Sequence, residues 1–452
     1  MATIAEQDSG LAPVTRRHPA GLFILSATEL AERFSYYGMT ALLALYMVRQ
    51  LLLPEHAPNV IGLAALRSLF EFRGPMADQA FASLIYGWYG GLVYFTPIVG
   101  GWLADRWLGK KMAVTIGALL MAAGHLAMSM DATFLIALVL LILGSGLLKG
   151  NISAQVGTLY PPESESLRER GFTIFSTGIN VGAVAGPLAT GATAAIYGWH
   201  AGFALAAVLM LVALAIYLSG QRHLPSQKPQ RSARAELPPL NPEEKRRTWA
   251  ILLLILLIVP AAISYTMIWN VGIVWIDEHV ALGIVPASWF NAVDSFASIA
   301  IAPVLVALWA WQSNRDAEPG ALTKIMIGLA VTGASALIFV LGTLYPNADG
   351  KVSVIWALLA FFGMGVGFMW YWPVTLATVS KAAPAKVNST LMGASFIAFF
   401  LGTTLMGWVG SFYEEMSNTA FWTLDAAIAF AGALLILVVR KPLTNALGLC
   451  TT

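Results

Sequence analysis

The chain has 452 residues, of which 58% are hydrophobic and only 11% are charged, and its formal net charge is +2. About a quarter of the residues of a soluble protein are charged, so this composition excludes a water-soluble globular fold. The single cysteine, Cys450, excludes an intramolecular disulfide and a cysteine-rich metal site.

Twelve apolar segments reach the roughly 20 residues that a helix needs to cross a bilayer. In chain order we predict spans at 20–48, 80–104, 112–130, 132–158, 171–196, 199–219, 248–276, 286–311, 322–345, 352–379, 388–412 and 419–439. A polar, proline-rich segment separates the sixth span from the seventh and is too short to be a domain. We therefore predict an all-α membrane protein with twelve transmembrane helices in two six-helix halves.

The distribution of lysine and arginine sets the orientation, because these residues concentrate on the cytoplasmic side of a membrane. Of the 26 such residues, only Arg49, Arg67, Arg73 and Lys351 fall in the predicted outer loops when both termini are inside. We expect a multi-pass protein of the inner cell membrane. Its predicted parts are a cytoplasmic tail (1–19), an N-terminal bundle (20–219), a cytoplasmic linker (220–247), a C-terminal bundle (248–440) and a cytoplasmic C-terminal tail (441–452).

The first span contains three ionisable residues in "ELAERFSYYG", namely Glu29, Glu32 and Arg33. Ionised side chains inside a bilayer cost several kcal/mol each, which marks them as functional. Their spacing of three and four places them on one helical face, which Tyr36 and Tyr37 continue. A structural pair between Glu29 and Arg33 is the plainer interpretation. However, this pair leaves the second carboxylate without a partner, so that it could bind a proton or pair with a distant cation.

Lys149, in "LGSGLLKGNIS", is the obvious candidate for that cation. It lies roughly 16 Å inward from the cytoplasmic end of the fourth span, so it must face a cavity or a carboxylate. Tyr94, Asn180 and Trp370 stand at a similar distance from the cytoplasmic ends of their spans. We expect these four residues to form a layer near the middle of the membrane.

Asp294 is an acid well inside the C-terminal half, nine residues from the predicted start of its helix. That depth argues against a capping role and predicts a side chain that faces the cavity. Asp425 is nearer its helix start and is expected at the interface, whereas membrane-embedded His125 is expected to be packed or interfacial. The chain has no HExxH, GxSxG or Walker motif, so we expect neither an enzyme nor a bound cofactor.

Two motifs resemble known transporter signatures. "GGWLADRWLGKK" resembles the loop after the second helix in the major facilitator superfamily, and "ELAERFSYYG" matches the E-x-x-E-R-F-x-Y-Y signature of the proton-coupled oligopeptide transporter (POT) family. "GSGLLKGNIS" and "FSTGINVG" resemble that family's fourth and fifth helices, and the likeness extends through nearly the whole chain. The resemblance implies that Glu29, Glu32, Arg33 and Lys149 couple protons and bind the peptide carboxylate, and that Tyr36, Tyr37, Tyr94 and Asn180 line the pocket.

The chain also departs from the family pattern. Ser176 replaces the tyrosine of the fifth-helix motif, and "PAAISYTMIWNVGIVWI" lacks the glutamate usual on the seventh helix. Phe368 stands where the tenth helix usually has a glutamate, and Trp372 replaces the serine that follows. Asp294 occupies a position where the family usually has an asparagine. We expect it to replace the missing acid and to bind the substrate amine.

The predicted function is a proton-coupled symporter that imports di- and tripeptides by alternating access. Arg33 and Lys149 would bind the peptide carboxylate, with Trp370 beside the substrate. The alternative is a transporter of the same fold for an amino acid, metabolite or drug, since both C-terminal glutamates are absent and Trp370, Tyr371 and Trp372 are consecutive. No feature favours a receptor. The expected partners are the solute, protons and the lipid bilayer, without nucleic acid, and the expected functional unit is a monomer.

Overall fold

The computed structural model describes residues 17–72, 74–161, 164–225 and 239–449. Within these ranges the chain is helical, and the only β pairing is a single bridge between Val280 and Val352. Most of the predicted N-terminal tail, the middle of the predicted linker and the last three residues lie outside the described ranges.

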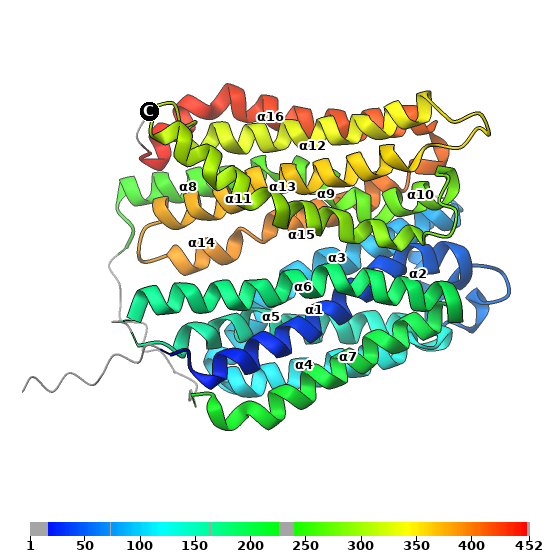
Figure 1. Ribbon diagram of the computed structural model, residues 1–452, viewed down its shortest axis with the longest axis horizontal. Coiled ribbons are helices and arrows are strands. Elements are labelled where there is room, and N and C mark those ends of the chain that lie inside the picture. The colour runs from blue at the N-terminus through cyan, green and yellow to red at the C-terminus, as the bar shows by residue number, and fades with distance from the viewer. Residues whose placement is uncertain (1–16, 73, 162–163, 226–238, 450–452) are drawn as a thin grey trace, which may run out of the picture.

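The first half consists of six long helices, with a short helix α2 (Leu63–Phe70) between the first two. The long helices are α1 (Ala20–Tyr46), α3 (Asp78–Leu103), α4 (Lys110–Met128), α5 (Phe134–Thr158), α6 (Glu165–Tyr197) and α7 (Trp199–Gly220). Figure 1 shows them together in the lower part of the molecule.

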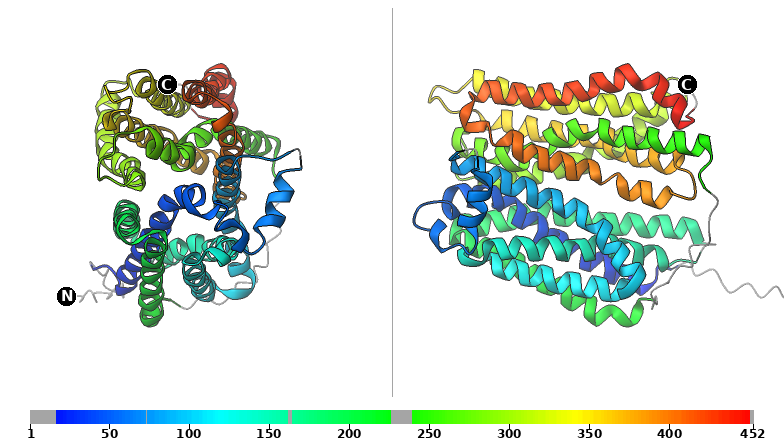
Figure 2. Two further views of the ribbon diagram at one scale, coloured as in Figure 1. Left: turned by 90° about the vertical axis from the view of Figure 1, so that its right-hand side faces the viewer. Right: turned by 180° about the vertical axis from the view of Figure 1, so that it is seen from behind.

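The second half contains six further spans, two of which are built from shorter helices. Its helices are α8 (Pro242–Leu257), α9 (Val259–Met267), α10 (Ile273–His279), α11 (Asn291–Ser313), α12 (Ala321–Leu344), α13 (Val354–Ala382), α14 (Asn388–Ala394), α15 (Ile397–Gly410) and α16 (Asn418–Leu447). The first three form one span, as do α14 and α15. The view along the helices in Figure 2 shows this half as a second group beside the first.

Ten of the helical segments among the described residues are long and apolar enough to cross a membrane. The other two long helices, α1 and α3, run in the same bundle (Figure 1), and α1 carries the three ionisable residues found in the sequence. The fold is thus an all-α, multi-pass membrane protein, and its helix order agrees with a twelve-span arrangement.

Several helices extend beyond the predicted spans. The first helix of the second half begins at Pro242, inside the segment assigned to the linker. There Asn241 accepts a hydrogen bond from the backbone N–H of Glu244, and the Glu244 side chain accepts one from the Asn241 N–H. Helix α16 continues to Leu447, so part of the predicted C-terminal tail is helical. Hydropathy marks only the apolar part of a helix, and charged turns can continue it into water.

The boundary between the halves includes a close approach of two helices. A Cβ atom added to Gly87 of α3 would lie 2.7 Å from the Cα of Gly407 on α15. These helices therefore meet backbone to backbone, which only small residues allow. Nearby, the rings of Tyr94 and Phe399 are 5.1 Å apart, so aromatic contacts continue the boundary toward the middle of the membrane.

Polar links between the halves lie toward the end of the bundle opposite the described termini. Arg49, just after α1, pairs with Asp277 at 2.8 Å and with Glu278 at 3.2 Å on α10. The indole N–H of Trp289 donates to the carbonyl of Leu188 on α6 at 2.9 Å. The two halves are therefore fastened at the predicted outer side.

Candidate functional site

The centre of the candidate site is a buried charge cluster on α1. The Nε atom of Arg33 lies 3.1 Å from Oε1 of Glu29 and also contacts the carboxylate of Glu32. All three side chains are buried, and Glu32 is fully inaccessible to solvent. One oxygen of each carboxylate and one guanidinium nitrogen have no hydrogen-bond partner among the described residues. Two acids thus share one base, as their sequence spacing permits.

Helix packing holds this cluster in place. A Cβ atom on Gly182 of α6 would lie 2.8 Å from the Cβ of Arg33, so α6 can approach α1 only because residue 182 lacks a side chain. Gly186 and Gly38 meet in the same way one turn further along. The short distance between α1 and α6 leaves the side chain of Arg33 little freedom to move away from its carboxylates.

Lys149 approaches the cluster from α5, but its expected ion pair with a carboxylate is not formed. Its Nζ atom lies 4.1 Å from the ring centre of Tyr36 and 5.7 Å from that of Tyr94. Lys149 also interacts electrostatically with Glu29, Glu32 and Arg33. Arg33, on the same helix as both acids, contacts both carboxylates instead. Lys149 instead rests on an aromatic face.

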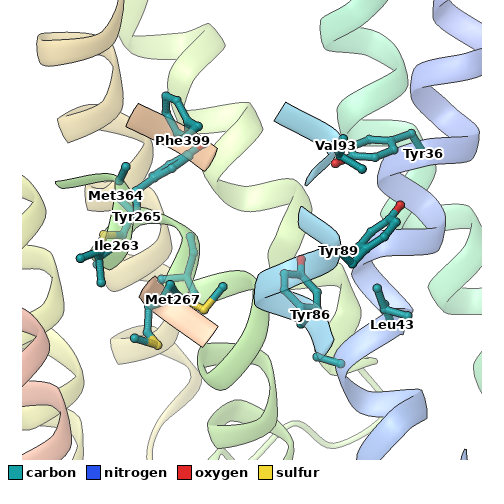
Figure 3. Close-up of a cluster of buried hydrophobic side chains, with 14 of the residues drawn as sticks. Tyr36, Leu43, Tyr86, Tyr89, Val93, Ile263, Tyr265, Met267, Met364 and Phe399 are labelled. Carbon is teal, nitrogen blue, oxygen red and sulfur yellow. The ribbon is translucent and has the colours of Figure 1, made fainter. Parts of the chain in front are cut away.

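A small cavity lies between the halves beside these aromatic rings. It has a volume of about 10 Å³ and is lined by Tyr36, Thr40, Tyr86, Tyr89, Gly90, Tyr94, Thr266, Trp269 and Thr403. Figure 3 shows Tyr36, Tyr86 and Tyr89 on one side of this boundary and Tyr265 and Phe399 on the other. A space of this size holds about one water molecule. A larger molecule could enter this space only if the halves moved apart.

Asp294 lies at the same boundary, on α11, and is almost fully buried. Its Oδ2 atom accepts a hydrogen bond of 2.8 Å from the hydroxyl of Tyr265 on α9, whereas Oδ1 has no partner among the described residues. Tyr37, Tyr86 and Tyr94 of the other half lie within range of its charge. Asp294 therefore lies beside the boundary and has a hydrogen-bond partner, but it is not among the residues that line the small cavity. That its side chain faces a substrate cavity stays a prediction.

The expected depth of Asp294 within its helix needs correction. A 3-10 turn (Ala287–Phe290) precedes α11, so Asp294 lies in the first turn of the α-helix itself. The sequence places an apolar run here but does not distinguish a 3-10 turn from an α-helical one. The close contact of α13 explains the burial, since a Cβ on Gly365 would lie 2.3 Å from the Asp294 carbonyl oxygen.

The three consecutive aromatic residues of α13 do not form one cluster. Trp370 packs edge-on against Trp309 of α11, with ring centres 5.5 Å apart, and Trp372 packs against Phe399 at 4.7 Å. Tyr371 is fully buried and faces Gly328 of α12. Successive residues of a helix point about 100° apart, so neighbours in sequence meet different partners. Trp370 is therefore not brought to the charge cluster.

Asn180 is likewise not joined to the cluster by any described contact. Its side chain is exposed on α6, two residues from both Gly178 and Gly182, which pack against α1. A two-residue step turns a side chain by about 200°, which places Asn180 on the face of α6 away from α1. Of the four residues expected in one layer, the structure brings together Lys149 and Tyr94.

Two other membrane-embedded groups are buried away from this boundary. Asp425 is fully buried rather than interfacial, because its helix α16 packs against α9, where the Ser264 hydroxyl donates to the Asp425 carbonyl. Neither carboxylate oxygen of Asp425 has a hydrogen-bond partner within the described ranges. His125 is packed and fully buried, which agrees with one of the two expectations.

The sequence did not lead us to four aromatic residues at the boundary between the halves, namely Tyr86, Tyr89, Tyr265 and Trp269. Their spacings of three and four are helical and would have placed each pair on one face. Phe368, at the position of the expected glutamate, stacks on Tyr265 with ring centres 4.7 Å apart. The stacked pair of Phe368 and Tyr265 thus stands where an acid was expected, and the hydroxyl of Tyr265 donates to Asp294.

Comparison with known proteins identifies a family. The family model that matches this chain is described as the POT family and covers residues 111–238 and 240–426, more than half of the chain. The described residues include no group of three or more His, Cys, Asp or Glu side chains that could hold a metal ion.

The similar proteins match over nearly their whole lengths. A di-/tripeptide transporter of Lactococcus lactis subsp. cremoris is 28% identical, covering 95% of this chain and 97% of that protein. Peptide transporter YePEPT of Yersinia enterocolitica subsp. palearctica is also 28% identical, covering 95% and 96%. The crystal structure of peptide transporter POT in complex with sulfate aligns with a TM-score of 0.83 at 26% identity, again over 95% and 96%.

Proposed function

The chain belongs to the POT family, and we propose that it is a proton-coupled symporter that imports di- and tripeptides by alternating access. The observation that carries the proposal is the buried sharing of Arg33 by Glu29 and Glu32, with Lys149 close by but not in an ion pair. This arrangement holds one more carboxylate than a single guanidinium can neutralise. It is therefore suited to taking up and releasing a proton.

The charge balance suggests how the proton and the peptide are coupled. A proton on Glu29 or Glu32 removes one negative charge from Arg33, which can then accept the carboxylate of a peptide with help from Lys149. Loss of the proton restores the second carboxylate, and the restored charge competes with the peptide for Arg33. Binding of the proton thus favours binding of the peptide, and its release favours release of the peptide.

The opposite pole of the peptide requires an acceptor for its ammonium group. Asp294 is suited to this role because one of its oxygens has no partner among the described residues and because tyrosines of the other half lie within range of its charge. Tyr265 would hold the carboxylate in place through its 2.8 Å hydrogen bond. A zwitterionic peptide would thus bind between Arg33 and Lys149 on one half and Asp294 on the other.

The positions of the links between the halves support alternating access. The Arg49 ion pairs fasten the predicted outer side, and the central cavity is too small for a peptide. A transport cycle would have to break these outer links to admit substrate and re-form them before release. The pathway lies between the halves of a single chain, so we expect a monomer to be sufficient. We further propose that the protein lies in the inner membrane with both termini in the cytoplasm.

The names of the relatives favour peptides over the alternative of a non-peptide solute. Two of the similar proteins are named as peptide transporters, and both match over almost their entire length. The absence of the C-terminal glutamates then reflects a different acid, Asp294, rather than a different class of substrate.

Transport by the purified full-length protein in proteoliposomes tests the proposal. With an inward proton gradient, radiolabelled dialanine should accumulate above its outside concentration, and a protonophore should abolish the accumulation. Counterflow with a panel of dipeptides, tripeptides and free amino acids should show exchange with the peptides alone. Exchange with amino acids but not with peptides would instead establish the non-peptide alternative.

A further inference from the structure

A second and larger cavity lies far from the charge cluster, at the end of the second half that carries the described C-terminus. Its volume is about 1110 Å³, within the size range of small-molecule sites. The end of α11, the start of α12 and the ends of α13 and α16 form its walls. Figure 1 shows these helix ends together at the upper left. The transport mechanism proposed above does not use this cavity.

The cavity is basic. Four cationic side chains line it, Lys324, Lys381, Arg440 and Lys441, against two acids, Asp316 and Glu318. Glu318 pairs with Lys324, which is mostly buried against the face of Trp309. Within the described ranges the other three cations form no ion pair. Cations gathered around a cavity repel one another, so an anion inside it would lower the free energy of the group.

Helix packing leaves this cavity beside the membrane. Helix α11 packs on α13 and α6, whereas α12 packs on α13 and α16, so α11 and α12 diverge toward the cavity. The adjoining surface of α11 exposes Val304, Val306 and Trp311, as a lipid-facing surface would. A bound group can therefore enter from the bilayer as well as from water.

Much of the remaining wall is apolar and includes Trp309, Leu322, Pro373, Val374 and Ala377. On α13, Pro373, Val374 and Ala377 precede Lys381 and so lie on its membrane side. An anion with an attached hydrocarbon chain matches this combination of a charged rim and an apolar interior. A soluble anion would leave the apolar wall uncovered. The uncapped start of α12, at Ala321, adds a further positive potential at the rim.

We propose that this cavity binds the phosphate headgroup of an anionic phospholipid from the cytoplasmic leaflet. Lys381, Arg440 and Lys441 would contact the phosphate, and the apolar wall would hold the upper part of an acyl chain. Basic pockets between transmembrane helices on the cytoplasmic side are suited to such headgroups. Bound lipid would tie α11, α12, α13 and α16 together at this end of the C-terminal half.

The test uses the purified full-length protein, stripped of lipid in detergent, and its melting temperature as the readout. The probes are dioctanoyl phosphatidylglycerol, dioctanoyl phosphatidylcholine and sodium phosphate at matched ionic strength. A ligand that binds only the folded state raises the melting temperature in proportion to its affinity. We expect a saturable rise with phosphatidylglycerol alone. An equal rise with sodium phosphate would show that the cavity binds free phosphate rather than a lipid. An equal rise with phosphatidylcholine would show that an anionic headgroup is not required.

Two variants locate the effect. Lys381→Gln, Arg440→Gln and Lys441→Gln, combined, should weaken phosphatidylglycerol binding roughly 10- to 100-fold, since each cation contributes about a tenfold effect or less. The matched control combines Arg170→Gln, Lys245→Gln and Arg246→Gln, which remove the same charge from exposed positions outside the cavity and should bind normally. Equal binding of phosphatidylglycerol by both triple variants would show that this cavity is not the binding site.

A separate variant keeps every charge and removes space instead. Ala377 is exposed in the cavity wall, and Ala377→Trp would fill part of the volume. This variant decides the matter if the triple variant does not fold. We expect it to lose the phosphatidylglycerol effect, and an unchanged effect would show that the lipid binds elsewhere.

Discussion

The Nζ atom of Lys149 lies 4.1 Å from the ring centre of Tyr36, while Arg33 holds both carboxylates of the cluster. The half-buried lysine is thus kept beside the acids without being neutralised by direct contact. It is the cation of the cluster that is most available to a substrate carboxylate.

We predict that Lys149→Gln abolishes proton-driven accumulation of dialanine, because the remaining cation, Arg33, is occupied by two carboxylates. Uptake into proteoliposomes measures this effect, and size-exclusion chromatography reports whether the variant is folded. Lys245→Gln is the control, since Lys245 is exposed and remote from the cluster. Accumulation by the Lys149 variant at the normal level would contradict the proposed role.

Tyr36→Leu should weaken dialanine binding by roughly 2- to 30-fold, because it removes a cation–π contact of about 0.5–2 kcal/mol that positions Lys149. Tyr36→Phe keeps the aromatic face and should bind almost normally. Counterflow at a series of dialanine concentrations gives both affinities. If Tyr36→Phe were as impaired as Tyr36→Leu, the hydroxyl rather than the ring face would be the important group.

Glu29→Gln and Glu32→Gln should impair uptake against a gradient more than they impair exchange. A proton carrier is needed for net coupled movement, whereas exchange of labelled for unlabelled peptide needs no net movement of protons. Parallel measurements of gradient-driven uptake and of counterflow separate the two effects. Should both variants still concentrate dialanine with an unchanged pH profile, the proton carrier would have to be another group, and Asp294→Asn would be tested next.

Asp294→Asn should weaken binding of dialanine by about 1–3 kcal/mol, the value of a charge-assisted hydrogen bond to the peptide ammonium. N-acetyl-dialanine has no ammonium group and should be affected little. Tyr265→Phe removes the hydroxyl that donates to Asp294 and should act in the same direction but more weakly. Binding of both ligands to both proteins forms a double-mutant cycle. Equal losses for the two ligands would assign Asp294 a structural role.

Arg49→Gln should increase access to the central cavity from the outer side. The Arg49 pairs are partly exposed and should be worth about 0.2–1 kcal/mol each. Labelling of Thr40→Cys, in a Cys450→Ser background, by an impermeant maleimide measures this access. Arg67→Gln is the control, because Arg67 pairs with Glu71 and Asp78 of its own half. Similar labelling rates in both arginine variants would show that the Arg49 pairs do not hold the outer side closed.

The pair between Glu318 and Lys324 should make a small, pH-dependent contribution to stability. The hydrogen bond from Lys324 lowers the pKa of Glu318 below its ordinary value of 4.5. A lowered pKa in the folded state gives a contribution that is present above about pH 4.5 and is lost as the pH falls through the folded value. Glu318→Gln should therefore lower the melting temperature at pH 7 by no more than about 2 °C, and this difference should shrink as the pH falls below 4.5. Glu55→Gln, at an exposed site, is the control, and an effect of Glu318→Gln that did not shrink on acidification would exclude the ion pair as its cause.

The sequence by itself determined the features that depend on local chemistry. The bilayer thickness sets the length of an apolar helix, so hydropathy located the long helices even where they are broken, as between α9 and α10. The contacts among Glu29, Glu32 and Arg33 are also local. Glu29 and Arg33 are four residues apart and share a helical face, and Glu32 is adjacent to Arg33 in the chain. The family motif lies in this same segment, and the family model matches other parts of the chain, residues 111–238 and 240–426.

Only the tertiary structure decided which of the distant groups meet. The rotation of each helix and its distance from its neighbours depend on packing between residues far apart in the chain, such as Gly182 with Arg33 or Gly365 with Asp294. That packing placed Lys149 on Tyr36 and gave Asp294 a hydrogen bond from Tyr265. It also turned Trp370 toward Trp309, although the depth of Trp370 along its helix had suggested a place in the same layer as Lys149. Depth along a helix can be counted in the sequence, but the direction in which a side chain points is fixed by the helices around it.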